Sequence, residues 1–327
     1  LLLWIMTGTI ITASSHHWLI AWVGLELNTL AVLPVISKTK HPRAIEASTK
    51  YFLTQAIASC LMLFSSITNA WWTGSWDITQ MDNKYTSATM IIALTMKAGA
   101  VPLHFWLPEV MQGSTLHAAM LISTWQKLAP MALLYSMSNN SQPLLTMTLG
   151  ILSTTLGGWA GMNQTQLRKM MAYSSITNMG WTLMILTPEP NISAISILTY
   201  ILMITPTFLL LITTSTKTLQ NMSTSWTTSP TATTTLAMLL LSTAGLPPLT
   251  GFLPKLLILN ELVTQKLTPI ATMITLTSLL NLTFYLRTVY MTTLLNSPAS
   301  TTSTMKWRQK QHGAKPTILA PTAIAST

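Results

Sequence analysis

The feature that most constrains this chain is a succession of long apolar segments that carry almost no charge. Of its 327 residues, 7% are charged and 49% are hydrophobic, whereas about 25% of the residues of a soluble domain are charged. A helix needs about 20 apolar residues to cross a hydrocarbon layer about 30 Å thick. The sequence therefore predicts an all-α, polytopic membrane protein.

We predict about eleven transmembrane helices from these segments. They lie at roughly 1–14, 18–37, 50–72, 87–107, 114–137, 143–161, 170–187, 192–214, 232–262, 268–294 and 316–327. The first and last are shorter than a span, and we expect both to be truncated. Ser and Thr are frequent in the segments, but their hydroxyls can bond to a preceding carbonyl inside a helix.

The basic residues test this topology independently, because positive charge concentrates in loops on the side that is not translocated. Eleven crossings leave only Lys84 and Lys266 on one side. The other side collects Lys38, Lys40, Arg43, Lys50, Arg168, Lys169, Lys217, Lys306, Arg308, Lys310 and Lys315. The net charge of +10 therefore reflects membrane topology, and we expect no nucleic-acid partner.

An internal repeat links two of the apolar segments. Residues 99–109 match residues 245–255, and Gly, Pro, Leu, an aromatic residue, Leu and Pro recur in register. Proline breaks a helix because it lacks an N–H and clashes with a preceding carbonyl. Five start-to-start steps separate the two segments, so they run in opposite directions. Paired broken helices in inverted halves indicate an ion or substrate site near the membrane midplane, although isolated proline kinks are common in membrane helices.

This pattern predicts two inverted five-helix repeats with broken helices. We expect the first half to occupy residues 1–140, with its broken helix fourth. The second half then occupies residues 141–296, with its broken helix ninth, and residues 297–327 form a basic loop and a final helix.

Three lysines, Lys97, Lys127 and Lys255, lie inside segments that otherwise read as membrane-buried. A cation in hydrocarbon costs several kcal/mol unless it faces the bundle interior, a partner or water. Together they predict a charge pathway. The alternative is that each long side chain reaches the membrane interface and its charge has no function.

Two further residues are candidates for proton transfer. Glu26 lies in the middle of the second segment, between two leucines, and His104 lies in the first break. A histidine titrates near neutral pH, which suits a proton relay. Hydrogen bonding to a carbonyl freed by the break is an equal alternative for His104.

No redox or metal chemistry is visible in the sequence. It has no Gly-x-Gly-x-x-Gly after a strand and no phosphate-binding loop, and Cys60 is its single cysteine. A cysteine cluster for an iron–sulfur centre is therefore excluded. We expect no cofactor and no metal on this chain.

Several motifs, taken in order, carry a resemblance to a known family. They are Trp22-Val-Gly-Leu-Glu26-Leu-Asn, Lys50-Tyr-Phe-Leu-Thr-Gln, Met96-Lys97-Ala-Gly-Ala-Val-Pro, Thr124-Trp-Gln-Lys127-Leu-Ala-Pro, Asn163-Gln-Thr-Gln-Leu-Arg-Lys and Gly245-Leu-Pro-Pro-Leu-Thr-Gly-Phe-Leu-Pro-Lys255. The chain resembles the antiporter-like membrane subunits of mitochondrial NADH:ubiquinone oxidoreductase, respiratory complex I. The match covers essentially the whole chain, and the motif order favours the animal mitochondrial branch.

The resemblance implies a multi-pass protein of the mitochondrial inner membrane whose basic loops face the matrix. It implies proton pumping coupled to the oxidation of NADH by ubiquinone, with Glu26 paired to Lys97. From their places in the sequence we expect Lys127 to be the next proton acceptor and Lys255 the station on the exit side. The expected partners are other membrane-arm subunits, including sister antiporter-like subunits, and the lipid bilayer. NADH, FMN, iron–sulfur clusters and ubiquinone are then bound elsewhere in the complex, so the chain is part of an enzyme without a redox centre.

Two other functions have the same broken helices. A stand-alone cation/proton antiporter would exchange ions without a redox partner. A non-pumping scaffold subunit of the same complex would only hold its neighbours, and the cost of burying charged residues argues against it.

Overall fold

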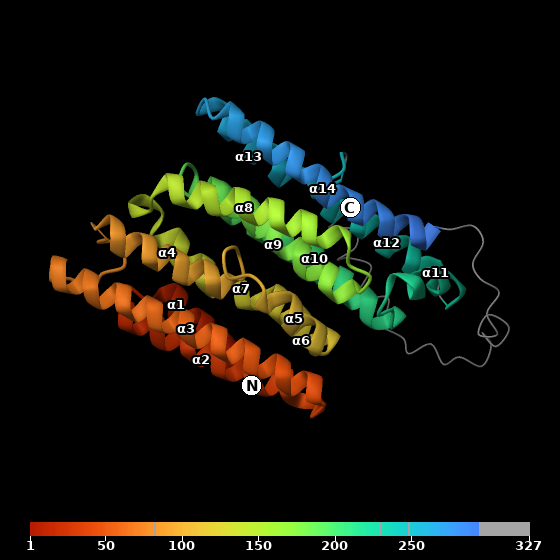
Figure 1. The fold of residues 1–327 in the computed structure, drawn as a ribbon, viewed down its shortest axis with the longest axis horizontal. Helices are drawn as coiled ribbons and strands as arrows, with labels where there is room; N and C mark the ends of the chain where they lie inside the picture. Colours follow the sequence, from red (N-terminus) through yellow and green to blue (C-terminus); the bar gives the residue numbers. More distant parts are fainter. Residues whose placement is uncertain (82, 229, 248, 294–327) are drawn as a thin grey trace.

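The computed structural model describes residues 1–81, 83–228, 230–247 and 249–293, and this part is helical apart from loops and two isolated β-bridges (Figure 1). The first seven α-helices are α1 (Leu2–Ser14), α2 (Trp18–Ile36), α3 (Pro42–Thr73), α4 (Lys84–Ala98), α5 (Trp106–Gly113), α6 (Leu116–Ser123) and α7 (Trp125–Ser136). They are followed by α8 (Pro143–Met162), α9 (Leu167–Ile185), α10 (Pro190–Thr214), α11 (Leu219–Thr228), α12 (Pro230–Ala244), α13 (Phe252–Thr264) and α14 (Thr268–Thr293). Two 3₁₀ turns, η1 (Ser37–Thr39) and η2 (Ser138–Asn140), follow α2 and α7.

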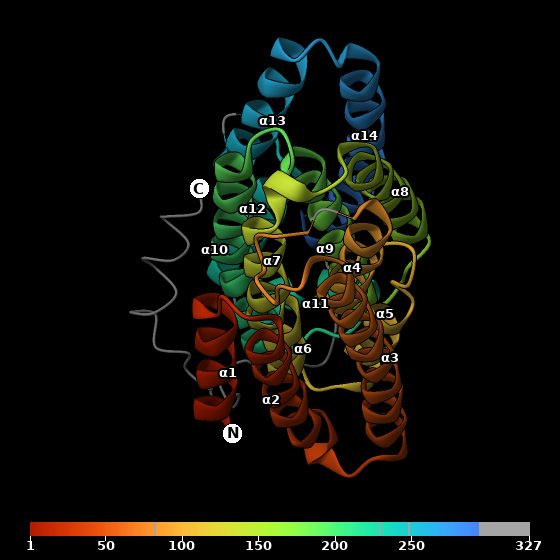
Figure 2. The ribbon, with the colours of Figure 1, turned by 90° about the vertical axis from the view of Figure 1, so that its left-hand side faces the viewer.

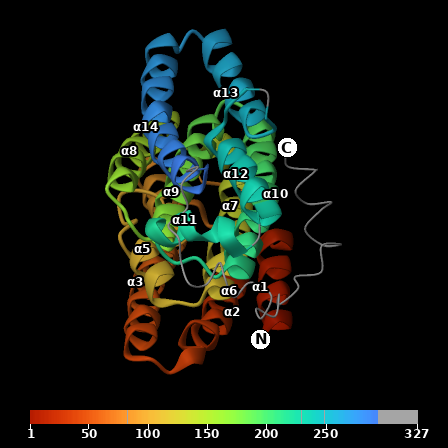
Figure 3. The same ribbon diagram turned by 90° about the vertical axis from the view of Figure 1, so that its right-hand side faces the viewer.

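The long helices run roughly side by side. Figure 1 shows α1, α2 and α3 at one edge and α13 and α14 at the opposite edge. The view turned by 90° places α4, α7, α9 and α10 between these edges (Figure 2). In the opposite view α11 crosses at a steep angle to the other helices (Figure 3). The first part of the chain, α1 to α7, meets the second part, α8 to α14, where α5 packs against α9 and α6 packs against α10.

Four helical stretches in the described residues are long and apolar enough to cross a membrane. They are Trp18–Thr39, Pro42–Thr73, Pro190–Thr214 and Thr268–Thr293. Buried hydroxyls do not interrupt such helices, because they bond to carbonyls three residues earlier. Examples are Thr12 to Thr9, Ser65 to Met62 and Thr207 to Ile204, as expected for hydroxyl residues inside helices.

Two breaks in the helices share one backbone design. Gly99 ends α4 and Gly245 ends α12, and both lie in the left-handed region, with φ of 78° and 80°. Each glycine takes part in the hydrogen bonds of a Schellman cap. The Gly99 N–H donates to the Met96 carbonyl, and the Gly245 N–H donates to the Ser242 carbonyl. Glycine is suited to this position because other residues are strained at positive φ.

The next helices, α5 and α13, begin at Trp106 and Phe252, which match each other in the repeat. Each break thus leaves a helix carboxyl end inside the bundle, opposite the start of a second helix. Pro248, which belongs to the second copy of the repeat, lies outside the described residues.

Several predicted segments differ from the helices of the structure. The segment 87–107 ends as a helix at Ala98, and 232–262 is divided into α12 and α13. The segment 114–137 is divided at Thr124 into α6 and α7. The backbone at Thr124 departs from the helical conformation, with φ of −110° and ψ of −74°, and its hydroxyl bonds to the Met120 carbonyl at 2.7 Å.

Other differences lie at helix ends. The helix predicted over 50–72 begins at Pro42, which suits a first helical position, so Lys50 lies in α3 and not in a loop. Helix α11 falls in a stretch predicted as a loop. The predicted segment 316–327 and the third predicted region, 297–327, lie outside the described residues.

Candidate functional site

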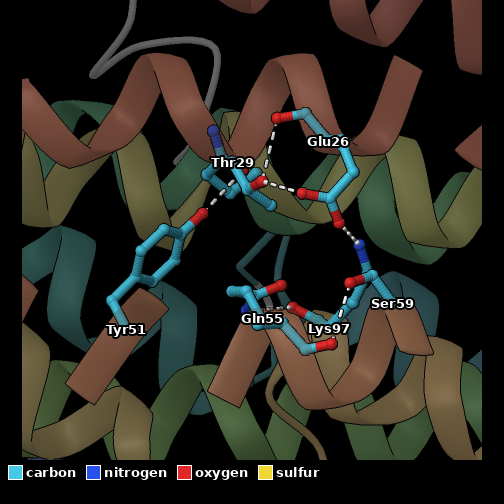
Figure 4. Close-up of polar contacts among 8 residues, drawn as sticks. Glu26, Thr29, Tyr51, Gln55, Ser59 and Lys97 are labelled. Carbon is cyan, nitrogen blue, oxygen red and sulfur yellow. Dashed lines mark hydrogen bonds and ion pairs between the residues drawn. The ribbon is translucent and has the colours of Figure 1, made fainter. Parts of the chain in front are cut away.

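Glu26 and Lys97 face each other from two helices of the first half of the chain. The Lys97 Nζ atom of α4 lies 3.6 Å from Oε1 of Glu26 in α2, and Figure 4 shows the two side chains pointing toward one another. The Lys97 side chain is 2% exposed and that of Glu26 is 25% exposed. A buried ammonium needs such a partner, so the carboxylate compensates the charge of Lys97.

Polar side chains surround this ion pair. The Thr29 hydroxyl lies 3.3 Å from Oε2 of Glu26, and the Gln55 amide donates to the Lys97 carbonyl at 3.5 Å. Figure 4 also shows Ser59 beside Lys97. Lys97 lies in the last turn of α4, where the carboxyl end of the helix dipole favours a cation.

Lys127 has a different kind of partner. It lies in α7, is 2% exposed, and its Nζ donates to the carbonyl of Ser175 in α9 at 3.1 Å. The same atom lies 5.0 Å from the centre of the Tyr200 ring in α10. An aromatic face and a carbonyl stabilise an ammonium without neutralising it, so Lys127 has polar partners but no carboxylate within ion-pair distance among the described residues.

Lys255 bonds back to the break of its own broken helix. From the first turn of α13 its Nζ donates to the carbonyl of Ala244, the last residue of α12, at 2.6 Å. The ammonium also lies 5.9 Å from the Trp181 ring of α9. The sequence repeat aligns Lys255 with Glu109, but in space Lys255 occupies the carboxyl end of α12.

This position corresponds to that of Lys97 at the carboxyl end of α4. The residue two positions before Gly245 is Thr243, whereas the residue two positions before Gly99 is Lys97. Each broken helix therefore has an ammonium at the carboxyl end of its first part. In one case it comes from the first helix, and in the other from the second helix.

His104 is buried in the first break and 3% exposed. Its Nδ1 atom lies 3.3 Å from the carbonyl oxygen of Pro102, and its ring lies 4.2 Å from that of Phe105. This contact is a hydrogen bond to a backbone carbonyl, the interaction given above as the alternative to a proton-relay role for His104. The structure brings Glu26 and Lys97 into an ion pair, while His104, Lys127 and Lys255 each bond to a backbone carbonyl.

A buried amide bridge was not predicted from the sequence. The Gln126 amide donates to Asn28 Oδ1 at 2.8 Å, and the Tyr51 hydroxyl lies 3.5 Å from Gln126 Oε1. Asn28 is two residues from Glu26, and Gln126 precedes Lys127. Helix α7 thus contacts α2 through Gln126 and α9 through Lys127. An amide in an apolar segment, next to a candidate lysine, is the signal that could have identified it.

A second group of buried polar side chains lies on α10 and α14. The hydroxyls of Tyr200 and Tyr285 and both amide atoms of Asn281 are buried and have no hydrogen-bond partner among the described residues. Buried polar atoms of this kind are normally satisfied by protein or by internal water. The periodicity of α14 alone could not identify Asn281 and Tyr285, because it does not show which face is buried.

Glu109, the acidic residue of the repeat, belongs to a surface ion pair. Its Oε2 lies 2.7 Å from Lys50 Nζ, which also lies 2.6 Å from Glu46 Oε1. All three side chains are at least 41% exposed. Exposed pairs contribute little to stability, and Glu109 lies at the surface of the described structure and not among the buried charges.

The fold and the buried lysines define an antiporter-like membrane protein, and comparison with known proteins supports this class. A family model described as NADH:quinone oxidoreductase/Mrp antiporter, TM, matches residues 15–281. Two solved structures share the fold. A chain of respiratory complex I from Thermus thermophilus superposes with a TM-score of 0.85 at 24% identity, over 99% of this chain and 75% of that one. A chain of the Mrp complex from Dietzia gives 0.82 at 17% identity, over 99% and 72%.

Curated relatives define the family more narrowly. A second family model, described as NADH dehydrogenase subunit 2 C-terminus, matches residues 282–327. The NADH-ubiquinone oxidoreductase chain 2 of Tetraodon nigroviridis is 49% identical over all of this chain and 93% of its own length. That of Xenopus laevis is 49% identical over 96% and 90%. The chain belongs to the NADH-ubiquinone oxidoreductase chain 2 family, the antiporter-like, proton-translocating membrane subunits of respiratory complex I. The resemblance seen in the sequence motifs is confirmed.

Proposed function

We propose that this chain conducts protons through a path of buried side chains formed by Glu26, Lys97, Lys127 and Lys255, with His104 at the first break. The observation that carries this proposal is the ion pair of Lys97 and Glu26 at 3.6 Å, beside a helix break inside the bundle. A charge buried at this depth is costly and is retained where it has a function.

Contacts between the helices support the order that we propose for the stations. The Glu26 and Lys97 pair is followed by the amide bridge of Asn28 and Gln126, which leads to Lys127 as the next residue of α7. Lys127 contacts α9 and α10, and Lys255 contacts α9 and α12. Both later lysines, Lys127 and Lys255, therefore contact helix α9.

The proposed mechanism begins with a change in the protonation state of Lys97 that depends on Glu26. The Glu26 carboxylate stabilises the ammonium form of Lys97, so a movement of Glu26 away from Lys97, or the approach of another cation, favours release of the Lys97 proton. Lys127 and Lys255 depend on neutral carbonyls and ring faces. They can therefore accept or release a proton without leaving a carboxylate unpaired.

The proposal includes the architecture expected from the sequence: eleven membrane crossings in two inverted halves, 1–140 and 141–296, followed by 297–327. The matched glycine caps at Gly99 and Gly245 support the repeat. The basic loops then face the matrix side of the mitochondrial inner membrane. Lipid and sister antiporter-like subunits would surround the chain, and the redox groups, FMN, iron–sulfur clusters and ubiquinone, would lie in other subunits.

Proton transport by the assembled complex with Lys127→Met tests the path. In proteoliposomes we expect NADH-driven proton uptake and quinone reduction to fall together, because the central station is lost. Lys217→Met, at an exposed lysine, is the matched control and should behave as the unchanged complex. Unaltered coupled turnover in an assembled Lys127→Met complex would overturn the path.

The rival functions give other results. A stand-alone cation/proton antiporter would exchange sodium for protons when the purified chain alone is placed in vesicles, without NADH or quinone. A scaffold subunit would tolerate loss of all three lysines, provided that the complex assembles.

A further inference from the structure

A groove lies on the outer surface of the bundle between α2 and α3. It has a volume of about 530 Å³ and is lined mainly by Leu33, Pro34, Ser37, Ser48, Phe52 and Leu53. Leu33 and Pro34 belong to the last turn of α2, and Phe52 and Leu53 belong to the third turn of α3. The groove therefore lies beside the short connection that joins these helices, which Figure 2 shows at the lower edge of the molecule.

The groove is apolar and open. Phe52 is 48% exposed and Leu53 is 59% exposed, whereas their helix buries Tyr51 and Gln55 on its other face. The Ser48 and Thr49 hydroxyls donate to carbonyls of their own helix, Ile45 and Glu46. They therefore do not draw a polar ligand into the groove, and its floor fits a hydrocarbon chain.

Positive charge gathers on the connection that borders the groove, next to the lining residue Ser37. Lys38, Lys40 and Arg43 lie on the connection and the first turn of α3, and all three are exposed. None of them forms an ion pair with a described residue, whereas the nearby Glu46 is already paired with Lys50. The Arg43 charge also attracts Glu46, but that carboxylate is bonded to Lys50, so the connection presents an excess of positive charge next to the apolar groove.

An apolar floor ending at a cluster of cations fits one chemical class. Basic pockets at the ends of membrane helices bind acidic phospholipid headgroups, while acyl chains lie along the apolar surface beneath. A partner helix would cover the length of α2 and α3 and would not require three cations at one end. We propose that the groove between α2 and α3 binds an anionic phospholipid, with an acyl chain against Leu33, Pro34, Phe52 and Leu53 and its phosphate at Lys38, Lys40 and Arg43.

Lipid retention by the intact complex tests this site. The complex is purified, stripped of bound lipid in detergent and incubated with spin-labelled phosphatidylglycerol or phosphatidylcholine. The immobilised fraction of each lipid is then measured. Each basic residue contributes about fivefold to binding of an acidic lipid, so Lys38→Gln, Lys40→Gln and Arg43→Gln combined should weaken phosphatidylglycerol binding at this site by about two orders of magnitude.

A second triple variant distinguishes loss of this site from a general loss of positive charge. Lys84→Gln, Lys217→Gln and Lys266→Gln combined remove the same number of positive charges at exposed positions elsewhere, and should leave phosphatidylglycerol retention unchanged. Equal retention in both triple variants would overturn the proposal, as would equal retention of the two lipids by the unchanged complex.

A photocrosslinking group at position 53 identifies the occupant directly. Capture of added phosphatidylglycerol supports the lipid site, and capture of a neighbouring polypeptide overturns it. This readout is independent of proton pumping, so it does not depend on the proposed proton path.

Discussion

Lys97, Lys127 and Lys255 are all buried, but their partners divide them into two kinds. Lys97 has a carboxylate at 3.6 Å, whereas the other two bond to the carbonyls of Ser175 and Ala244. A carboxylate can switch the charge state of its partner by moving, and a backbone carbonyl cannot. At the scale of the residue, control of the proposed path therefore lies at Glu26.

Glu26→Gln tests this control. The amide is similar in size but cannot neutralise Lys97, so we expect quinone reductase and proton pumping to fall several-fold together. NADH oxidation by an artificial acceptor that bypasses quinone should be unchanged, which shows that the redox arm is intact. The double variant Glu26→Gln with Lys97→Met should be little worse than either single variant, because both changes act on one pair. Additive losses would argue against a functional pair.

The ring of Tyr200 should matter more than its hydroxyl. Tyr200→Phe keeps the aromatic face 5.0 Å from Lys127 and should retain most of the coupled activity. Tyr200→Leu removes an interaction that contributes about 2 kcal/mol in a desolvated site and should slow turnover at least tenfold. If both variants lose activity equally, the hydroxyl and not the ring is the functional group.

At the scale of the element, the breaks bring helix ends into the bundle. The glycine caps at Gly99 and Gly245 stop α4 and α12, and at the second break the Ala244 carbonyl accepts a hydrogen bond from the Lys255 ammonium. A Cβ atom on Gly245 would lie 2.7 Å from Lys255 Nζ. The cap and the lysine therefore fit together as one unit.

Gly245→Ala should impair this unit. A residue with a Cβ atom at this positive φ costs about 1–2 kcal/mol, and the added methyl group displaces the Lys255 ammonium from Ala244. Gly74→Ala is the control, because Gly74 has a φ of 72° but nothing within 4 Å of an added Cβ. We expect lower coupled activity in an assembled complex for Gly245→Ala and near-normal activity for Gly74→Ala. Equal activity of the two variants would show that the cap does not position Lys255.

Local sequence signals predicted where helices begin, end and break better than they predicted the contacts between helices. Gly and Pro at 99–108 and the apolar run before them predicted a break near Lys97, because backbone rules act over a few residues. The return of Lys255 to Ala244, the break at Thr124 and the bridge from Gln126 to Asn28 depend on how helices pack. The repeat alignment paired Lys255 with Glu109, since alignment compares positions along the chain and not the places that long side chains reach.

At the scale of the whole molecule, the two parts of the chain are joined by polar contacts as well as by packing. The Arg168 guanidinium of α9 donates to the Ser114 carbonyl at the end of α5. Lys127 likewise connects α7 to α9. A path that crosses from one part to the other needs these contacts to hold the helices in register.

Arg168→Met should weaken the junction. Loss of a charge-assisted hydrogen bond to a partly buried carbonyl costs about 1–3 kcal/mol, so we expect less assembled complex and a lower thermal transition. Lys169→Met, at the next residue, is the control, since no ion pair involves Lys169 among the described residues. Unchanged assembly of Arg168→Met on a native gel would argue against a structural role for this bond.

The most direct test of the account is the number of protons pumped per electron pair by the complex with Lys97→Met, with assembly checked on a native gel. Because Lys97 forms the ion pair with which the proposed path begins, we predict an assembled complex in which pumping and quinone reduction are both strongly reduced. An assembled complex that pumps the normal number of protons at the normal rate would contradict the account and would leave this chain with a scaffold function.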